Sequence, residues 1–411
     1  MVLEMARRAG AAQPVLGTAT SEIRRLALDA VADALEAQAA QVLAANAADV
    51  ESAVAAGLPG PMVARLSLDP VKWGKVVDGV RAVATLPDVL GEELTSWQRP
   101  NGLAITKVRV PLGVIGIIYE ARPNVTADAA ALCLKTGNAV LLKGGKEAAR
   151  SNEAIGAASR SGLDAAGLPA DLVQVLPASR EAAAALMGAA GLVDVLIPRG
   201  GAGLIKAVVE QSKVPVIETG TGVCHVYVHE AARLEMATEI IVNAKCSNPA
   251  VCNSAETLLV DRAVAESFLP MAAEALRSRG ATLRGCPETL RLLPSAEPAT
   301  EVDWSEEHLN LTLAVRVVDG PDHALAHIAH YGTRHSEAII TEDAAMAARF
   351  LREVDAAVVY HNASTRFTDG GEFGFGAEIG ISTQKLHARG PMGLAELTSY
   401  KYLVAGTGQI R

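Results

Sequence analysis

Cys252 is the cysteine of this chain that is best placed to act as a nucleophile. It lies in a polar segment, Asn243-Ala-Lys-Cys-Ser-Asn-Pro-Ala-Val-Cys252-Asn-Ser-Ala-Glu256, just before an apolar strand that begins at Thr257. A thiolate adds to acyl carbons to form a thioester and leaves again, so this position suits acyl transfer or carbonyl chemistry. The alternative is that Cys252 is a small buried apolar side chain, as most unpaired cysteines are.

The turn from Tyr119 to Thr126 joins a predicted parallel strand to its helix. Its sequence is Tyr119-Glu-Ala-Arg-Pro-Asn124-Val-Thr126, and it lies at the carboxyl edge of the strands, where open α/β sheets bind ligands. The Asn124 amide is a candidate donor for the negative charge on an adduct at Cys252, a contribution worth roughly 3 to 4 kcal/mol in other enzymes. The alternative is that Asn124 and Thr126 only cap the helix.

Two glycine turns follow later strands in the same way. Lys143-Gly144-Gly145-Lys146 lets the backbone approach a ligand and supplies two ammonium groups that attract phosphate. Pro198-Arg199-Gly200-Gly201-Ala-Gly203 does not match the GxGxxG pattern of dinucleotide-binding turns. Each turn alone is also compatible with solvated side chains, but three such turns at one sheet edge indicate a nucleotide site.

Glu218 ends the last predicted strand of the first domain and precedes a Thr-Gly-Thr-Gly segment. A carboxylate there could act as a general base; equally, the glycines could form a hinge between domains with Glu218 in solvent. His225 and His229 lack acidic or cysteine partners at metal-ligand spacing, so we expect structural roles for them and no metal site. The other thiols lack the polar surroundings of Cys252.

The elements that must position these residues follow from apolar periodicity. A helical segment is expected over residues 21–95, with Ile23, Leu26, Leu28, Val31 and Leu35 on one apolar face, and an alternating strand over 104–110. A first βα series has strands at 114–119, 139–143, 173–176, 193–197 and 214–217 and helices at 126–135, 151–161, 180–187 and 203–211. A second series has strands at 225–228, 257–260, 313–318, 338–341 and 357–361 and helices at 234–244, 264–276, 323–330 and 344–353.

This alternation predicts an α/β protein with two doubly wound parallel-sheet domains. A length of 411 residues agrees with more than one domain. The tail at 400–404 is a candidate edge strand.

The net charge of -9 is spread along the sequence and argues against nonspecific nucleic-acid binding. No apolar run reaches the roughly 18 residues of a membrane span, so we expect a cytoplasmic protein with five reduced cysteines.

Several long, irregular motifs of the chain resemble those of a known protein family. They include Tyr119-Glu-Ala-Arg-Pro-Asn-Val-Thr126, Ile197-Pro-Arg-Gly200, Val251-Cys-Asn253 with Glu256-Thr-Leu-Leu-Val260, and Gly390-Pro-Met-Gly-Leu394. The chain resembles the aldehyde dehydrogenase superfamily over essentially its whole length. Within that superfamily it is most similar to the branch that reduces L-glutamyl 5-phosphate to L-glutamate 5-semialdehyde, the second step of proline biosynthesis from glutamate.

The resemblance implies a role for each matching residue. Cys252 looks like the superfamily nucleophile, Asn124 like the oxyanion asparagine, and Lys143 and Glu307 like the residues that contact the adenosine ribose and the nicotinamide ribose. Where NAD-dependent relatives have a ribose-binding carboxylate, this chain has Lys146, whose charge favours the 2′-phosphate of NADPH. The predicted cofactor site consists of Lys143, Gly144, Lys146, Arg199, Gly200 and Glu307.

The implied reaction proceeds through a thioester at Cys252 with release of phosphate, so no water needs activation and Glu218 has no assigned role. Arg122, Lys245, Arg199 and Arg366 are the cations available to the phosphate. The sequence departs from the family after Lys245, where Cys246-Ser-Asn replaces an expected Thr-Gln-Arg. The alternatives are a hydrolytic or CoA-acylating aldehyde dehydrogenase, or a catalytically inactive scaffold.

The resemblance also predicts the domain organisation. An NADP-binding domain is expected over 1–220, with 98–110 as a bridging or oligomerisation strand, followed by a catalytic domain over 221–388 and an oligomerisation tail over 389–411. It further implies a homo-oligomer and, as a possible partner for substrate hand-off, glutamate 5-kinase.

Overall fold

The computed structural model describes residues 1–411, apart from the side chain of Pro61, and divides into two compact units. Unit 1 consists of Met1–Glu218, Gly374–Gly380 and Met392–Arg411. Unit 2 consists of Thr219–Phe373 and Ile381–Pro391. Contacts therefore assign residues 374–380 to unit 1, whereas the sequence-based division placed them in the second domain. The functions given to the predicted domains stay predictions.

Unit 1 contains a four-stranded parallel sheet in the order β5-β4-β3-β6. Every residue of β3 (Val114–Tyr119) is buried, as expected for a parallel strand that helices cover on both faces. The neighbouring strands hold a fixed register, in which Ile117 lies opposite Leu142 and Ile197. The other strands are β4 (Ala139–Lys143), β5 (Val173–Val175) and β6 (Val195–Arg199), and the connecting helices are α6 (Asn124–Lys135), α7 (Ala149–Ala165), α8 (Arg180–Met187) and α9 (Ala202–Gln211).

The predicted strand at 214–217 is wrong. Only Val216 pairs, through a single bridge to Leu196. The Ser212 side chain donates to the Val214 carbonyl (2.7 Å) and accepts from its N–H (3.0 Å), which curls the chain before a strand can start. Pro215 has no N–H to contribute to a ladder. The segment therefore touches the sheet edge without extending it.

Five helices precede this sheet in unit 1. They are α1 (Val2–Gly17), α2 (Ser21–Ala37), α3 (Ala39–Ala55), α4 (Gly60–Leu66) and α5 (Pro70–Thr85). The predicted helical segment is confirmed for α2 to α5, whereas α1 was not predicted. The expected apolar face of α2 is only partly correct, because Leu28, Val31 and Leu35 are buried but Ile23 and Leu26 are 43% and 49% exposed. Arg24 is buried in α2 and pairs with Asp88.

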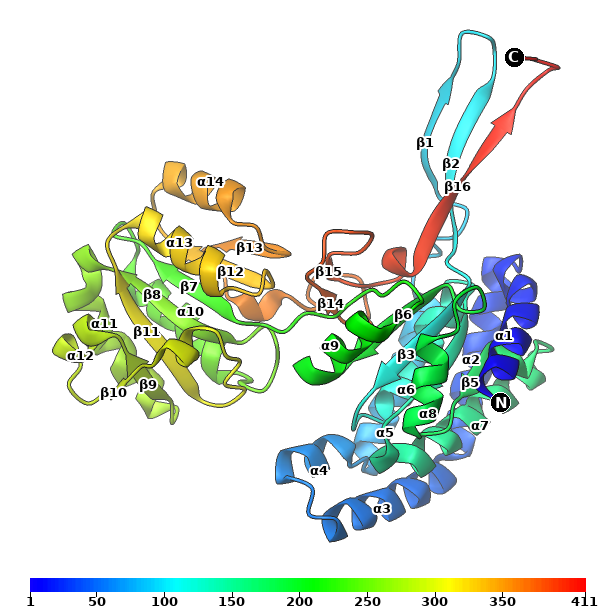
Figure 1. The fold of residues 1–411 in the computed structure, drawn as a ribbon, viewed down its shortest axis with the longest axis horizontal. Coiled ribbons are helices and arrows are strands. Elements are labelled where there is room, and N and C mark those ends of the chain that lie inside the picture. The colour runs from blue at the N-terminus through cyan, green and yellow to red at the C-terminus, as the bar shows by residue number, and fades with distance from the viewer. The chain divides into compact units, whose positions relative to one another are not determined.

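A three-stranded antiparallel sheet, with strand order β1-β2-β16, forms an arm of unit 1 (Figure 1). It consists of β1 (Glu93–Gln98), β2 (Ala104–Pro111) and β16 (Thr398–Ala405). The predictions of a strand at 104–110 and of an edge strand at the C-terminal end are confirmed. β1 was not predicted as a separate strand, and its residues 93–95 fall in the segment that was expected to be helical. In the register, Tyr400 lies opposite Arg109 and Tyr402 opposite Lys107.

Unit 2 contains a seven-stranded parallel sheet in the order β10-β9-β11-β8-β7-β12-β13. Its strands are β7 (Cys224–Val228), β8 (Ala255–Asp261), β9 (Thr282–Gly285), β10 (Glu297–Pro298), β11 (Thr312–Val318), β12 (Ser336–Ile340) and β13 (Val358–His361). Its helices are α10 (Leu234–Cys246), α11 (Arg262–Ser278), α12 (Pro287–Leu292), α13 (Pro321–Tyr331) and α14 (Ala344–Glu353). The second predicted βα series is confirmed, while β9, α12 and β10 are additional.

The core of unit 2 lies on both faces of this sheet. On one face, Val226 and Leu258 pack with Phe268 of α11; on the other, Tyr227 and Leu259 pack with Phe350 of α14. Two antiparallel strands, β14 (Ile381–Ser382) and β15 (Gly390–Pro391), complete the unit. The α/β architecture with parallel sheets is therefore confirmed.

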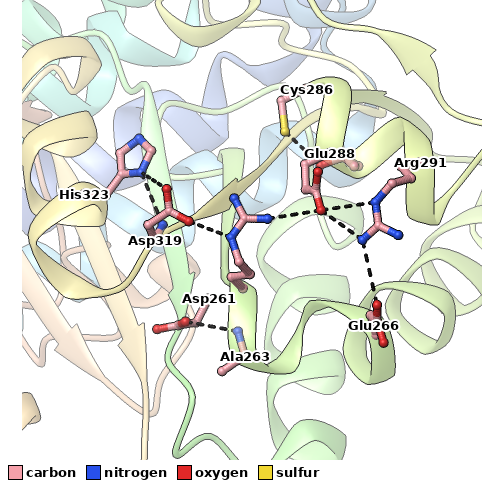
Figure 2. Close-up of polar contacts among 10 residues, drawn as sticks. Asp261, Ala263, Glu266, Cys286, Glu288, Arg291, Asp319 and His323 are labelled. Atoms are coloured by element: carbon pink, nitrogen blue, oxygen red, sulfur yellow. Dashed lines mark hydrogen bonds and ion pairs between the residues drawn. The ribbon is translucent and has the colours of Figure 1, made fainter.

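A network of exposed ion pairs links the first residues of α11 to α12 and to the end of β11 (Figure 2). Arg262 contacts Asp319 (2.6 Å) and Glu288 (3.1 Å), and Arg291 contacts Glu288 (2.9 Å). Exposed pairs of this kind contribute about 0 to 1 kcal/mol each. We therefore regard this network as a solvated surface feature. Among the helices that the structure describes, none is long and apolar enough to cross a membrane.

Candidate active site

Cys252 lies in the turn between α10 and β8. The residue is partly exposed, while the two residues that follow it, Asn253 and Ser254, are buried. The Ser254 N–H donates to the Val251 carbonyl (3.1 Å), and the Ser254 hydroxyl donates to the Ala244 carbonyl of α10 (3.2 Å). The turn is therefore closed by its own backbone and fixed to the helix before it, while Cys252 is partly exposed.

A second segment, η4 (Thr365–Phe367), is hydrogen-bonded to this turn. The Asn253 amide donates to the Thr368 carbonyl (2.9 Å), and the Thr365 hydroxyl donates to the Asn253 carbonyl (2.7 Å). The Arg366 guanidinium donates to the Asn253 side-chain oxygen and to the Ser247 hydroxyl (3.1 Å). The structure therefore places one of the predicted phosphate-binding cations, Arg366, beside the residue that follows Cys252.

The glycine segment before β7 packs against the Cys252 backbone. A Cβ atom at Gly222 would lie 1.4 Å from the Cys252 carbonyl oxygen, so a side chain cannot fit there. The Gly222 N–H donates to a Glu307 carboxylate oxygen (2.6 Å), and the Cys224 thiol donates to the same Cys252 carbonyl (3.2 Å). Burial raises the pKa of Glu307, and the Gly222 N–H partly offsets this. Glu307 and Cys252 thus share Gly222 as a neighbour.

Lys245 forms a fully buried ion pair with Glu256. Its ammonium lies 2.6 Å from the Glu256 carboxylate, and neither side chain is exposed. Burial lowers the pKa of Lys245 and raises the pKa of Glu256 to about 7, while each charge opposes the shift of its partner. Because its ammonium is enclosed and already paired, the structure favours a positioning role for Lys245 over the predicted contact with phosphate. The pair joins the last turn of α10 to β8 on either side of Cys252.

The three strand-to-helix turns of unit 1 are tied together by two glutamates that the sequence reasoning did not single out. Glu147 accepts the Ala121 N–H (2.6 Å), and Glu120 accepts the Gly201 N–H (3.1 Å). A Cβ at Gly200 would lie 2.5 Å from the Glu120 carboxylate. The turns that carry Asn124, Lys143 and Arg199 thus form one connected edge. The sequence signal was present, because each glutamate lies within one of the quoted turns or directly after it.

Asn124 is the first residue of α6 and does not cap it. The N-cap residue is Pro123 and makes no side-chain capping bond, so the capping alternative is wrong. The Asn124 amide nitrogen donates to Asp128 (2.9 Å), which fixes the direction of the amide. Burial raises the pKa of Asp128 to about 6, opposed by the Asn124 hydrogen bond and the charge of Arg199. Asn124 belongs to unit 1 and Cys252 to unit 2.

A cavity of about 300 Å³ opens beside the first glycine turn of unit 1. Gly144, Asn152, Pro177 and Ala178 are among the residues that line it. A Cβ at Gly144 would lie 2.0 Å from the Asn152 amide, so only glycine lets this amide pack against the turn. Lys143 is partly buried, and burial lowers its pKa, whereas Lys146 is exposed. The two lysines lie on the glycine turn and are not among the residues that line the cavity, which include Glu153.

The remaining predicted residues are located as follows. Arg122 is partly buried in the first turn, and its carbonyl accepts the Val125 N–H (3.0 Å).

Glu218 is the last residue of the long first segment of unit 1, and unit 2 begins at Thr219. Gly220 donates its N–H to the Ile381 carbonyl (2.9 Å) within unit 2. The division of the two units therefore falls at the glycine segment for which the sequence left base and hinge roles open.

Comparisons with known proteins show the family of the chain. Residues 2–282 match the model of the aldehyde dehydrogenase family. The chain is 68% identical to a gamma-glutamyl phosphate reductase of Symbiobacterium thermophilum, over 100% of both chains, and 57% identical to one of Carboxydothermus hydrogenoformans, over 100% of this chain and 99% of the relative.

Solved structures give the same result. The crystal structure of gamma-glutamyl phosphate reductase from Thermotoga maritima superposes with a TM-score of 0.98 at 45% identity, covering 100% of this chain and 99% of that one. An acetylating aldehyde dehydrogenase from Geobacillus thermoglucosidasius has a TM-score of 0.71 at 19% identity, a likeness that shows the fold alone. The chain therefore belongs to the aldehyde dehydrogenase family and, within it, to the gamma-glutamyl phosphate reductases, which are oxidoreductases.

Proposed function

We propose that this chain reduces L-glutamyl 5-phosphate to L-glutamate 5-semialdehyde with release of phosphate, using NADPH and a thioester at Cys252. The observation that carries the proposal is the Cys252 turn, whose backbone is held by Gly222, Asn253 and Cys224 while the residue itself is partly exposed. The name of the relative that is 68% identical over the whole chain supports the same substrate. The products correspond to the second step of proline biosynthesis.

The residues present fit a phosphorylated nicotinamide cofactor. Gly144 lets the Asn152 amide pack directly against the backbone of the first glycine turn, because a Cβ there would collide with Asn152. Lys143 and Lys146 supply positive charge at the first glycine turn, and the exposed Lys146 favours a 2′-phosphate. Arg199 and Gly200 lie on the connected edge, and we assign Glu307 to the nicotinamide ribose. When bound, NADPH supplies the hydride that converts the acyl group on Cys252 to the aldehyde level.

Cys252 forms the first new bond of the proposed reaction. Its thiolate attacks the C5 acyl carbon of the substrate, and the bond from this carbon to the phosphate oxygen breaks. The phosphate leaves with the electron pair of that bond, so the acyl group becomes a thioester without any change in oxidation level. After reduction, the carbon–sulfur bond breaks, the aldehyde is released, and the sulfur is regenerated as a thiolate.

Asn124 and Arg366 stabilise the charges that develop in these steps. The Asn124 amide, already directed by Asp128, supplies an N–H to the oxygen on the carbon that is bonded to Cys252. Arg366 is held at the Cys252 turn by Asn253 and Ser247 and supplies a cation for the departing phosphate. Arg122 and Arg199 are further candidates for that phosphate. No step requires activated water, so Glu218 has no catalytic assignment.

The reverse reaction tests this function. Purified protein is incubated with glutamate semialdehyde and NADP⁺, and formation of NADPH is followed by its absorbance. We expect NADPH to form only when phosphate or arsenate is added, because either anion must release the acyl group from Cys252. Turnover without either anion would overturn the proposal in favour of a hydrolytic enzyme. Turnover that depends on CoA would identify an acylating aldehyde dehydrogenase.

Two further expectations concern partners. An acyl phosphate hydrolyses readily in water, so we propose that glutamate 5-kinase supplies the substrate by hand-off. We also propose that the chain forms a homo-oligomer through the arm of β1, β2 and β16, which exposes several apolar side chains.

A further inference from the structure

The turn that carries Asn124 is fixed in the core of unit 1 at both of its ends. The Tyr119 hydroxyl at the end of β3 and the Thr126 hydroxyl of α6 share a hydrogen bond (2.7 Å), and the Thr126 hydroxyl donates to the Asn152 side chain of α7 (2.9 Å). All three side chains are at most 2% exposed. Asn124 lies between these two ends, so its position depends on the conformation of the middle of the turn.

Ala121, in the middle of the turn, has a backbone conformation that is unfavourable for an L-residue. Its φ is +41°, in the left-handed region, where the Cβ atom crowds the backbone. The residue is buried, at 4% exposure. Because an alanine keeps such a conformation only when neighbouring groups impose it, a contact that holds Ala121 is expected.

Glu147 makes this contact. Its carboxylate oxygen Oε1 accepts the Ala121 N–H at 2.6 Å, in a charge-assisted hydrogen bond. A Cβ at position 145 would lie 2.0 Å from the same oxygen, so Gly145 leaves the space that this carboxylate occupies. Glu147 belongs to η1 (Lys146–Ala148), directly after the first glycine turn. The second glycine of that turn therefore serves a contact within unit 1.

The Glu147 carboxylate also acts on Lys143. Burial lowers the pKa of Lys143, while the charges of Glu147 and Glu120 oppose this shift. Glu147 is thus a neighbour both of a lysine in the first glycine turn and of the backbone of the turn that carries Asn124. The Asp128 side chain orients the Asn124 amide, but it belongs to α6 as Asn124 does, and so it does not tie Asn124 to the glycine turn.

We propose that Glu147 is a positioning residue for the Asn124 amide. Its hydrogen bond keeps Ala121 in the left-handed conformation, and this conformation sets where the chain enters α6 at Asn124. Without the carboxylate, Ala121 relaxes toward negative φ and the amide is displaced. A displacement of about 1 Å costs up to about a hundredfold in rate. The proposal rests on the role that the proposed function gives to Asn124.

The kcat of the phosphate-dependent formation of NADPH tests this role. We expect Glu147→Ala to lower kcat by at least about tenfold, because the turn relaxes. Glu147→Gln keeps an oxygen that accepts the Ala121 N–H, so its loss is expected to be smaller. Glu51→Ala removes an exposed glutamate of α3 in the same unit and is expected to leave kcat unchanged.

Two double variants separate positioning from a general loss of structure. Glycine adopts positive φ without steric cost, so we expect Ala121→Gly to restore most of the kcat that Glu147→Ala loses. In an Asn124→Ala background, Glu147→Ala is expected to change kcat by less than about twofold, because the amide that Glu147 positions is already absent. A folding defect alone would lower kcat by the same factor in both backgrounds.

Hydrogen exchange provides a measurement that does not require turnover. Mass spectrometry of a peptide that contains residues 119–126 should show faster exchange in Glu147→Ala than in the unmodified protein or in Glu51→Ala, because the Ala121 N–H loses its acceptor. Equal exchange in all three proteins would show that the contact does not hold the turn.

Further results would overturn the proposal. One is an unchanged kcat in Glu147→Ala, and another is an equal loss of kcat with and without Asn124. If Glu147→Ala does not fold, the double variant with Ala121→Gly carries the test, and a kcat about tenfold below normal in that folded variant would refute the role of Ala121. An unmodified protein without turnover contradicts the proposed function, and with it the role of Asn124. Normal turnover of the unmodified protein with any of the other results overturns the role of Glu147 alone.

Discussion

At the residue scale, the proposed reaction depends on the sulfur of Cys252. A protein of the same fold without this thiolate would be inactive. Cys252→Ser keeps the size of the side chain but replaces the thiolate by a weak nucleophile, so we expect turnover to fall by at least about a thousandfold. Cys246→Ser is the matched control: it lies six positions earlier in the sequence, and burial raises the pKa of its thiol. Steady-state NADPH turnover measures both. Equal losses, or normal turnover of Cys252→Ser, would refute the assignment of the nucleophile.

Lys146 is the residue that sets the expected cofactor preference. Replacing it with alanine removes a positive charge from the first glycine turn, so we expect the KM for NADPH to rise about tenfold while the KM for NADH changes little. Lys206→Ala provides the control, because Lys206 is an exposed lysine of α9 that lies 3.8 Å from Glu210. Parallel increases of both KM values in Lys146→Ala would show that Lys146 does not recognise the 2′-phosphate.

Asp128 makes the stability of the chain depend on pH. Burial raises its pKa to about 6, so its ionised form is disfavoured in the folded state. Its contribution to the free energy of unfolding is present below about pH 4 and is lost as pH rises through about 6. Asp128→Asn lacks this titration, and we expect it to gain about 1 to 3 kcal/mol relative to the unmodified protein between pH 4 and pH 7. Denaturant unfolding at several pH values measures the difference.

The exposed Asp164→Asn is the control for this measurement. It should change the free energy of unfolding by the same small amount at every pH. A constant difference between Asp128→Asn and the unmodified protein would contradict the raised pKa of Asp128. Either result is independent of catalysis.

At the element scale, the close contact of Gly222 with the Cys252 turn joins two segments of unit 2. Gly222→Ala would place a methyl group 1.4 Å from the Cys252 carbonyl oxygen, so one of the two segments must move. We expect at least about a hundredfold loss of turnover and slower alkylation of Cys252 by iodoacetamide, because displacement of the turn misplaces the thiol. Peptide mass spectrometry after timed alkylation follows Cys252 separately from the other four thiols.

Gly74→Ala is the control for the glycine substitution. Gly74 lies inside α5, and nothing is within 4 Å of a Cβ built there. This change should stabilise the helix by about 1 kcal/mol and leave Cys252 alkylation unchanged. Normal alkylation and turnover in Gly222→Ala would show that the contact does not position the thiol.

The sequence was sufficient for the elements with strong periodicity and for the turns that carry chemistry. β3 was predictable because it is an uninterrupted apolar run, and β8 because it contains the apolar run 258–260. The Cys252 turn was predictable because its polar residues come just before that run. Contacts between distant segments were not predictable. Arg366 and Asn253 are 113 positions apart, and nothing in either motif indicates the other. The same limit applies to Ile23 and Leu26, whose exposure depends on how α2 packs against other helices.

At the scale of the whole molecule, the arm of β1, β2 and β16 has the properties of an interface. Trp97, Tyr402, Leu403 and Val404 are 41% to 57% exposed, and β16 is an outer strand of the arm with eight residues. Long apolar edge strands are rarely left in solvent, because their unpaired backbone groups recruit another strand. We therefore expect the chain to be a homo-oligomer that associates through β16.

Leu403→Lys tests this association by adding a charge to the apolar edge strand. We expect the mass measured by sedimentation velocity at micromolar concentration to shift toward that of a single 42.6 kDa chain. Ile410→Lys makes a comparable change at a site that is 95% exposed and lies outside β16, and it should leave the mass unchanged. A monomeric unmodified protein, or an oligomer that survives Leu403→Lys, would show that the apolar side chains of the arm do not hold copies of the chain together.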